Sequence, residues 1–306
     1  MNPRRATIDI GSNTVLLLLA EVSPYRELAK LSEVTGLGKG LDKTGEFARA
    51  SMDDSYAALA RYAQVCADAG VPAREIIATA TEASRVARNA PAFYEKVRRE
   101  LGIDVRIITG QAEAELTTKG VLFNTTFTAP EVVIMDIGGA STEFIRVSTA
   151  DKKILSSVSL KCGSVRASDW LRDGVFEERL TTALAALGGD GARYQSSVLH
   201  CVAGTLTSLG NMHLGNKTFV EDEVHGLTIT RADIEALAAK TQGWGAARFL
   251  SEFPFLGKRS EAMRGGIELT LRLLGHFRVE KCVISTYGLR YGTFLEGGIA
   301  DGYLAK

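Results

Sequence analysis

The sequence predicts an α/β protein built from two related domains. Its 306 residues exceed the length that one hydrophobic core usually supports. An apolar strand, a turn that begins Asp-Ile-Gly and a second apolar strand occur at Ala6–Val22 and again at Val132–Val147. Helical and strand patterns alternate after each copy of this unit, which favours a partly parallel sheet in each half.

Capping residues indicate where the predicted helices begin, and glycine or proline residues indicate where helices and strands end. The first half should contain a helix Ser51–Ala69, a strand Glu75–Ala80, a helix from Pro91 to the stop at Gly102, a strand Ile103–Ile108 and a helix Ala112–Leu122. The second half should contain a strand Val198–Ala203, a turn Gly204–Thr205, a helix from Leu206, helices Arg231–Thr241 and Glu261–His276, and a strand Lys281–Ser285. Glu33–Phe47 is expected to be a glycine-rich loop that borders a ligand.

Composition excludes several classes of partner. Lys plus Arg and Asp plus Glu both number 36, so the bulk charge gives no attraction to nucleic acid or to an anionic membrane. The four cysteines are far apart and should be reduced, buried thiols rather than zinc ligands or disulfides. The apolar stretch after Arg5 is interrupted by Asp9 and Asn13, so we expect no signal peptide and a cytoplasmic protein.

The two glycine-bearing turns are the candidate phosphate-binding elements. A glycine turn exposes backbone N–H groups to phosphate oxygens, because no Cβ blocks their approach. The alternative is that each turn is merely a tight hairpin without a ligand. Because the pattern occurs twice, this alternative is less well supported than it would be for a single copy. The predicted phosphate-binding residues are Gly11, Ser12, Asn13 and Thr14 in the first turn, and Gly138, Gly139, Ala140 and Ser141 in the second.

An aspartate stands at the end of the strand before each turn. Ionised Asp9 and Asp136 would repel a phosphate chain unless a divalent cation lay between the charges. The sequence therefore predicts Mg²⁺, or Mn²⁺ in its place, as the cofactor.

Three further features fit this chemistry. Glu113 lies in the first turn of a predicted helix, where it could deprotonate a water, although a capping box with Thr109 or Gly110 is the alternative. Arg85 follows a buried strand and suits forked recognition of phosphate, with a salt bridge to Glu82 as the alternative. Gly204 and Thr205 form a third strand-to-helix turn that could offer N–H groups to an anion.

Other hydrolytic and nucleotide-binding motifs are missing from the sequence. The four histidines form no HExxH pattern, and the chain contains neither a GxSxG elbow nor a GxxxxGK[ST] loop. Covalent serine catalysis and P-loop chemistry are therefore disfavoured.

These motifs together resemble the exopolyphosphatase / guanosine pentaphosphate phosphohydrolase (Ppx/GppA) family of the actin, sugar kinase and Hsp70 superfamily. The resemblance runs almost end to end. It rests on DIGSNTVLLLL, GLGKGLDKTG, ATEASRVARN, ITGQAEAELTTKGV, DIGGASTE, VAGTLTSL and YGLRYGTFLEG, in that order.

The resemblance implies two actin-like (ribonuclease H-like) α/β domains with mixed sheets and an interdomain cleft. Residues 1–124 with about 290–306 would form the first domain and residues 125–289 the second, without the extra C-terminal helical domains of longer members. It also implies Glu113 as general base, Arg85 as a phosphate-binding residue, and Asp136 and Glu143 around the metal and the attacking water. Asp9, Asp136 and Glu143 are the predicted metal ligands.

The implied activity is metal-dependent hydrolysis of the terminal phosphate of inorganic polyphosphate. Guanosine pentaphosphate, cut to the tetraphosphate, is the alternative substrate that the sequence does not separate. Ala112 and Ala140 depart from the family pattern of two adjacent acids and three glycines. A weakly catalytic protein that senses guanosine tetraphosphate or polyphosphate therefore stays open, as do a kinase or ATPase activity and a homodimer, which is common in the family.

Overall fold

A computed structural model of the chain describes residues 2–123 and 125–305. Contacts divide the chain into two units, Met1–Phe123 with Leu289–Lys306, and Asn124–Gly288. The sequence places the domain boundaries near residue 290 and at residue 124, and residue 124 lies outside the described residues. Each unit is described by itself below.

The first unit contains a five-stranded mixed sheet in the order β3-β2-β1-β4-β5. The first three strands form an antiparallel meander, whereas β4 and β5 run parallel to β1. The strands are β1 (Arg4–Ile10), β2 (Thr14–Val22), β3 (Tyr25–Val34), β4 (Ile77–Ala80) and β5 (Val105–Ile107).

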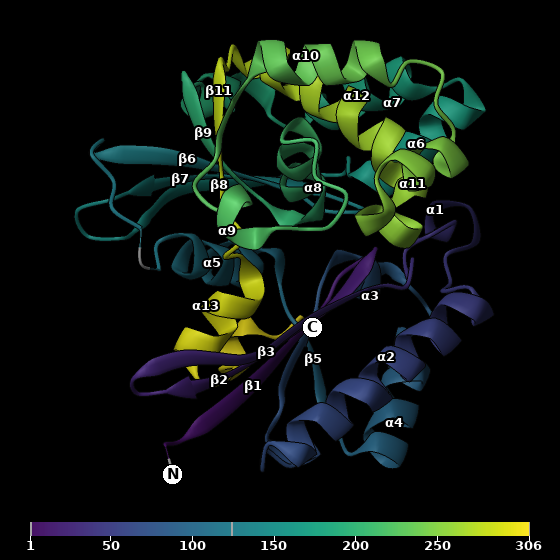
Figure 1. Ribbon diagram of the computed structural model, residues 1–306, viewed down its shortest axis with the longest axis vertical. Coiled ribbons are helices and arrows are strands. Elements are labelled where there is room, and N and C mark those ends of the chain that lie inside the picture. Colours follow the sequence, from purple (N-terminus) through teal and green to yellow (C-terminus); the bar gives the residue numbers. More distant parts are fainter. Residues whose placement is uncertain (1, 124, 306) are drawn as a thin grey trace. The chain divides into compact units, whose positions relative to one another are not determined.

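Helices cover both faces of this sheet (Figure 1). They are α1 (Leu41–Thr44), α2 (Arg49–Asp68), α3 (Glu82–Val86), α4 (Ala90–Leu101), α5 (Gly110–Val121) and α13 (Leu289–Glu296), with short 3₁₀ turns at Ala73–Glu75 and Asp301–Tyr303. Ile8 and Ile10 of β1 belong to the hydrophobic core formed with α2 and α4. Thr7 points to the opposite face, where its Oγ1 donates to the Arg290 carbonyl of α13. Because side chains alternate along a strand, Asp9 shares the face of Thr7.

Helix α13 lies against α5 on that face. The contact is close because Gly292 has no side chain: a Cβ there would lie 1.7 Å from the Leu116 carbonyl oxygen. Ile108, Leu116 and Leu289 form a small buried cluster beside this contact. The position of α13 therefore depends on a glycine in its first half.

The second unit repeats the topology of the first and adds one strand. Its sheet has the order β10-β11-β9-β6-β7-β8, in which β6, β7 and β8 form the antiparallel meander and β9 and β11 run parallel to β6. The strands are β6 (Glu131–Ile137), β7 (Thr142–Ser148), β8 (Ile154–Leu160), β9 (Val198–Val202), β10 (Thr228–Thr230) and β11 (Lys281–Ile284).

The helices of the second unit pack closely through glycines. They are α6 (Ser164–Asp173), α7 (Phe176–Ala185), α8 (Ala203–His213), α9 (Glu221–Val224), α10 (Arg231–Lys240), α11 (Ala246–Glu252) and α12 (Ser260–Phe277), with 3₁₀ turns η2 (Gly188–Tyr194) and η3 (Pro254–Arg259). A Cβ at Gly265 would lie 2.3 Å from Ser168 of α6, and one at Gly266 would lie 2.8 Å from Thr205 of α8. These two glycines let α12 contact both α6 and α8.

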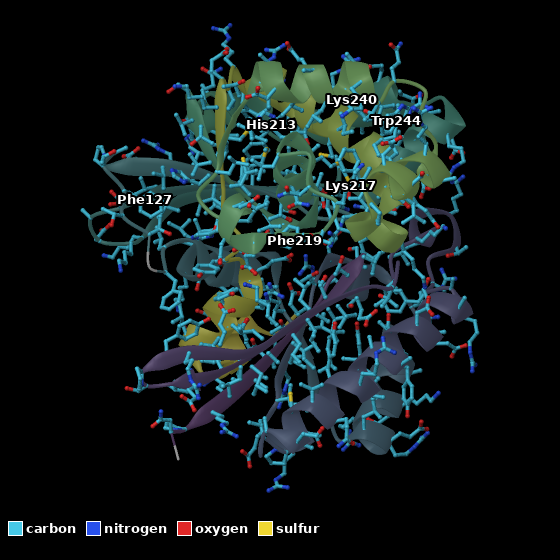
Figure 2. The ribbon with its side chains drawn as sticks, in the orientation of Figure 1. Phe127, His213, Lys217, Phe219, Lys240 and Trp244 are labelled. Carbon is cyan, nitrogen blue, oxygen red and sulfur yellow. The ribbon has the colours of Figure 1, made fainter. Side chains whose placement is uncertain are left out.

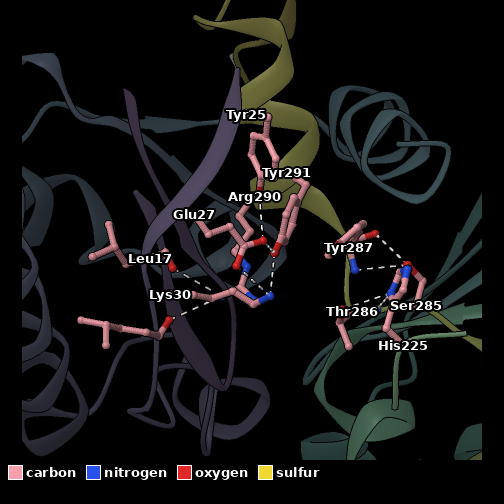
Figure 3. Close-up of polar contacts among 11 residues, drawn as sticks. Leu17, Tyr25, Glu27, Lys30, His225, Ser285, Thr286, Tyr287, Arg290 and Tyr291 are labelled. Atoms are coloured by element: carbon pink, nitrogen blue, oxygen red, sulfur yellow. Dashed lines mark hydrogen bonds and ion pairs between the residues drawn. The ribbon is translucent and has the colours of Figure 1, made fainter. Parts of the chain in front are cut away.

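The segment that leaves β11 is bound to the second unit by His225. The Thr286 N–H donates to His225 Nδ1 at 3.2 Å, and the rings of His225 and Tyr287 lie 4.3 Å apart (Figure 3).

The fold class predicted from the sequence is confirmed in its main feature: each unit is an α/β domain with a mixed sheet. The cleft expected between the domains stays a prediction. All four cysteines are buried and unbridged, as expected. Within the described part of the chain, no helix combines the length and the apolar character needed to cross a membrane.

Several element predictions were wrong. The edge strands β3 and β8 and the short β10 were not predicted, and β3 extends into the expected glycine-rich loop, which also contains α1. Gly204 and Thr205 are not a turn before a helix but its first residues, because α8 begins at Ala203. Ala203 makes the sharp change of direction after β9 with a φ of 71°. Helix α2 begins at Arg49 rather than at Ser51, without a side-chain cap.

The α5–α13 contact can be tested with Gly292→Ala. The added methyl group would overlap the Leu116 carbonyl and force the helices apart, so we expect a loss of about 2 kcal/mol or more in the free energy of unfolding. Gly298→Ala is the control, since nothing lies within 4 Å of a Cβ there. Urea denaturation measures both variants, and equal stability of the two would contradict the close contact.

Candidate functional site

The first glycine turn is held by its own backbone and by the loop after β3. Gly11 N–H donates to the Thr14 carbonyl at 2.9 Å, which closes the turn. Gly38 N–H donates to the Ser12 carbonyl at 2.6 Å, and a Cβ at Gly38 would lie 3.0 Å from Ser12 Cβ. The glycine-rich loop therefore packs on the turn and fixes its shape.

The second turn repeats this geometry in the other unit. Gly138 N–H donates to the Ser141 carbonyl at 3.0 Å, as Gly11 does to Thr14 in the first turn. The start of α6 closes over it: Ser164 N–H donates to the Gly138 carbonyl at 2.9 Å. A Cβ at Gly163 would lie 2.5 Å from the Gly139 carbonyl, so this approach requires a glycine.

Ala140 occupies the position where the family pattern has a third glycine. It is buried and does not have a positive φ. An alanine is therefore accommodated without backbone strain. The replacement of a third glycine by Ala140 is therefore no conformational argument against the second turn.

Glu113 and Arg85 form a partly buried ion pair in the first unit. Arg85 Nη2 donates to Glu113 Oε2 at 3.0 Å, and the two side chains are 16% and 12% exposed. An ion pair at this depth is screened less than a surface pair. The alternative that Glu113 closes a capping box is wrong, because Thr109 caps α5 and the box position is Ala112, whose N–H donates to Thr109 Oγ1.

The guanidinium of Arg85 is engaged on all sides. Nη1 donates to the Ile108 carbonyl at 2.7 Å, and Nε and Nη2 both donate to Glu82 Oε2. The salt bridge to Glu82, the alternative made from the sequence, is therefore present beside the bond to Glu113, and phosphate binding by Arg85 stays a prediction. This set of contacts fixes Arg85, which in turn orients the carboxylate of Glu113.

Asp9 presents a buried carboxylate oxygen at the end of β1. Its Oδ1 is shielded from solvent and has no hydrogen-bond partner among the described residues. Burial, with a smaller contribution from the charge of Glu113, raises the pKa of Asp9 to about 7. Burying a carboxylate oxygen without a partner costs folding free energy, unless a cation or a hydrogen-bond donor binds to it.

Arg290 of α13 supplies positive charge to the same face of the sheet. Its charge acts against the rise in the pKa of Asp9. Nη1 lies 3.5 Å from the carbonyl oxygens of Leu17 and Leu31, and the side chain is buried (Figure 3).

Two acids stand opposite one another in the second unit. Asp136 of β6 and Glu143 of β7 are directly paired in the antiparallel register, so both side chains project to one face. Ser159 Oγ donates to Glu143 Oε1 at 2.7 Å. The equivalent register in the first unit pairs Asp9 with Leu16, so only the second unit has this acid pair.

The start of α8 is contacted by Arg259 of η3, one of several scattered basic residues that the sequence does not distinguish from surface charges. A Cβ at Gly204 would lie 2.9 Å from Cζ of Arg259, so the guanidinium packs directly on the first turn of the helix. Ser208 Oγ, at 3.2 Å, is its one hydrogen-bond partner among the described residues. Burial lowers the pKa of Arg259 to about 10. With Thr205 beside it, this arrangement is suited to an anion.

Sequence alone gave no signal for Arg259. It follows Lys258 just before a helix, in a stretch that resembles an ordinary basic surface segment. Only the folded chain shows that one of the two bases turns inward.

The donor set fits a hard divalent cation in part. In the first unit the unpartnered Oδ1 of Asp9, and in the second unit the opposed carboxylates of Asp136 and Glu143, are oxygen ligands of the type that Mg²⁺ prefers. Like charges directly opposite on a sheet are destabilising, and a cation would relieve the repulsion. No group of three or more acidic, histidine or cysteine ligands is assembled among residues 2–123 and 125–305. Substrate oxygens and water would therefore have to complete the coordination.

One protein-family model matches most of the chain. The model described as the Ppx/GppA phosphatase family matches residues 20–297. A solved exopolyphosphatase from Cytophaga hutchinsonii is 25% identical, and the alignment covers 97% of this chain and 99% of that one with a TM-score of 0.86.

Two curated relatives add to this. A bifunctional 3-dehydroquinate synthase/phosphatase of Fusobacterium nucleatum is 26% identical over 96% of this chain and 46% of the relative. A guanosine-5'-triphosphate,3'-diphosphate pyrophosphatase of Aeromonas salmonicida is 29% identical over 68% of this chain and 42% of the relative. The chain thus spans less than half the length of these curated relatives.

The buried carboxylate of Asp9 predicts a pH-dependent stability. Its pKa is higher in the folded chain than in the unfolded chain, so ionisation destabilises the fold increasingly from about pH 4 to pH 7. In metal-free buffer, Asp9→Asn should be more stable than wild type at pH 8 by a few kcal/mol and much less so at pH 5. Urea titrations at the two pH values test this, and a difference independent of pH would contradict it.

Proposed function

Because the chain belongs to the Ppx/GppA phosphatase family, we propose that it hydrolyses the terminal phosphoanhydride bond of a phosphate chain and releases orthophosphate. Inorganic polyphosphate is the proposed substrate. The observation that most supports hydrolysis is the carboxylate of Glu113, held in place by Arg85 at the start of α5.

Glu113 would accept the proton of the attacking water. The carboxylate of a general base must be held in a fixed orientation towards the water, and the hydrogen bond from Arg85 fixes that orientation. The Arg85 charge also stabilises the ionised carboxylate that this role requires. Arg85 would therefore act chiefly as a positioning residue for Glu113, a change from the phosphate-binding role that the family resemblance implied.

The glycine turns would hold phosphate oxygens through backbone N–H groups. Phosphoryl transfer depends mostly on positioning and on neutralising the charge of the transferred group. The N–H groups of Gly11 and Gly138 close their own turns, so the residues that follow them would supply the donors, and the first turn of α8 with Arg259 would supply another set. The proposed phosphate contacts are thus distributed over both domains.

A divalent cation, Mg²⁺ or Mn²⁺, would supply the remaining positive charge. We propose Asp9, Asp136 and Glu143 as the residues that bind it, on the strength of the unpartnered oxygen and the opposed acids. These three side chains would contribute anionic oxygen ligands, which lie near the ends of paired strands beside the glycine turns.

Guanosine pentaphosphate is the second candidate substrate. A relative is named for action on guanosine-5'-triphosphate,3'-diphosphate, and that compound presents the same kind of terminal phosphate. A sensing protein without turnover is a weaker alternative, because Ala140 imposes no strain on the second turn.

Glu113→Gln tests the proposed base. The amide keeps the shape and part of the Arg85 contact but accepts no proton, so the rate should fall on the order of 10²-fold or more with KM little changed. Phosphate release from long polyphosphate with Mg²⁺ measures the effect. Glu115→Gln, two residues along the same helix, is the matched control and should retain wild-type turnover. A Glu113→Gln rate close to that of Glu115→Gln would reject Glu113 as the base.

Ala140→Gly tests whether the departure from three glycines weakens the second turn. Since the backbone at Ala140 has no positive φ, restoring glycine should change kcat/KM for phosphate release less than about threefold. An increase of tenfold or more would show that the alanine side chain obstructs the phosphate and would favour the sensing alternative.

A further inference from the structure

Residues 303–305 pair with the short connection between β5 and α5. Thr109 N–H donates to the Tyr303 carbonyl at 2.8 Å, and Ala305 N–H donates to the Ile107 carbonyl at 2.9 Å. The two residues between these bonds, one in each segment, form an antiparallel bridge. Residues 303–305, called the edge segment below, therefore extend the first sheet by a minimal strand at the end of β5.

The second unit has a strand at the equivalent edge of its own sheet. There β11 follows β6 and β9 as the third of the parallel strands, and β10 pairs antiparallel with its outer side. In the first unit β5 follows β1 and β4 in the same way. The edge segment thus takes the place of β10, although it comes from a part of the chain far from β5.

The connection that the edge segment bridges holds both members of the Arg85–Glu113 pair. The Ile108 carbonyl accepts from Arg85 Nη1 at 2.7 Å. The Thr109 carbonyl accepts from Glu113 N–H at 3.0 Å, and Thr109 Oγ1 accepts from Ala112 N–H at 3.1 Å. Thr109 therefore contacts the edge segment through its own N–H and the start of α5 through its two oxygens.

A side chain attaches the edge segment to the same region. The ring of Tyr303 is partly buried and packs against the apolar cluster of Ile108, Ala112, Leu116 and Leu289. Ala112 directly precedes Glu113 in α5. Backbone hydrogen bonds and apolar packing thus act on residues adjacent to the ion pair.

We propose that the edge segment positions Glu113 for proton transfer, by holding the two residues through which Arg85 and Glu113 are fixed. This inference rests on the proposed role of Glu113 as general base. A misplacement of about 1 Å can cost on the order of 10²-fold in rate. Loss of the edge segment should therefore lower kcat and leave KM nearly unchanged.

Ala305→Pro detaches the edge segment with one substitution. Proline has no N–H to donate, and its ring would occupy the place of the bond to Ile107. Leu304 has a ψ of 137°, which a following proline allows. In a phosphate-release assay with polyphosphate, kcat should fall roughly tenfold with little change in KM.

Two controls separate the lost hydrogen bond from other effects of the substitution. Ala305→Ser keeps the N–H donor and should retain the wild-type kcat. Ala300→Pro introduces the same ring into the same part of the chain, at a residue whose φ of −68° already suits proline. It should also retain the wild-type kcat.

Tyr303→Ala weakens the attachment without adding a proline. Loss of the ring from the apolar cluster should lower kcat in the same direction as Ala305→Pro, again with KM nearly unchanged. Phe219→Ala, which removes a 42% exposed ring from the second unit, is the matched control and should change neither constant (Figure 2).

A double-mutant cycle distinguishes positioning of the base from a general loss of structure. In a Glu113→Gln background the base is absent, so adding Ala305→Pro should lower kcat further by less than about twofold. A further tenfold loss in that background would overturn the inference, because the edge segment would then act independently of Glu113.

Hydrogen exchange, followed by mass spectrometry, tests the attachment without turnover. Amides of residues 109–113 should exchange faster in Ala305→Pro than in wild type, and at the wild-type rate in Ala300→Pro. Equal exchange in Ala305→Pro and wild type would overturn the inference. A Glu113→Gln variant as active as wild type would instead reject the proposed base, while exchange would still decide whether the edge segment holds the start of α5.

Discussion

The ion pair between Arg85 and Glu113 is the interaction on which the proposed chemistry depends. Arg85 is held by Glu82 of its own helix α3 and by the Ile108 carbonyl in the connection from β5 to α5. An isolated partly buried glutamate would tend to take up a proton or rotate towards solvent. The pair instead holds the carboxylate in one orientation, which a general base requires.

Duplication of one scaffold explains why a glycine turn proposed to bind phosphate occurs in both domains. Each copy has aspartate as the next-to-last residue of a buried strand, closes a turn from glycine N–H to a carbonyl and returns antiparallel. The copies then diverge at one register position, where Leu16 lies opposite Asp9 but Glu143 lies opposite Asp136. A common fold thus supplies the phosphate contacts twice, whereas the acid pair occurs in the second domain alone.

Much of this could be predicted from the sequence, and the omissions have physical causes. The strands around Asp9 and Asp136 were found because buried strands followed by glycine turns leave a strong local pattern. Edge strands such as β3 and β8 are partly exposed and polar, so they lack that pattern. Arg259 was missed because a base that turns inward has the same local sequence as one that faces water.

The central claim is that water, activated at Glu113, attacks the terminal phosphorus. A single-turnover reaction with polyphosphate in water enriched in ¹⁸O tests it most directly, by mass spectrometry of the released orthophosphate. The account predicts one ¹⁸O atom in each orthophosphate and none in the shortened chain. Label in the shortened chain, or transfer of the phosphoryl group to a nucleotide in place of water, would contradict it.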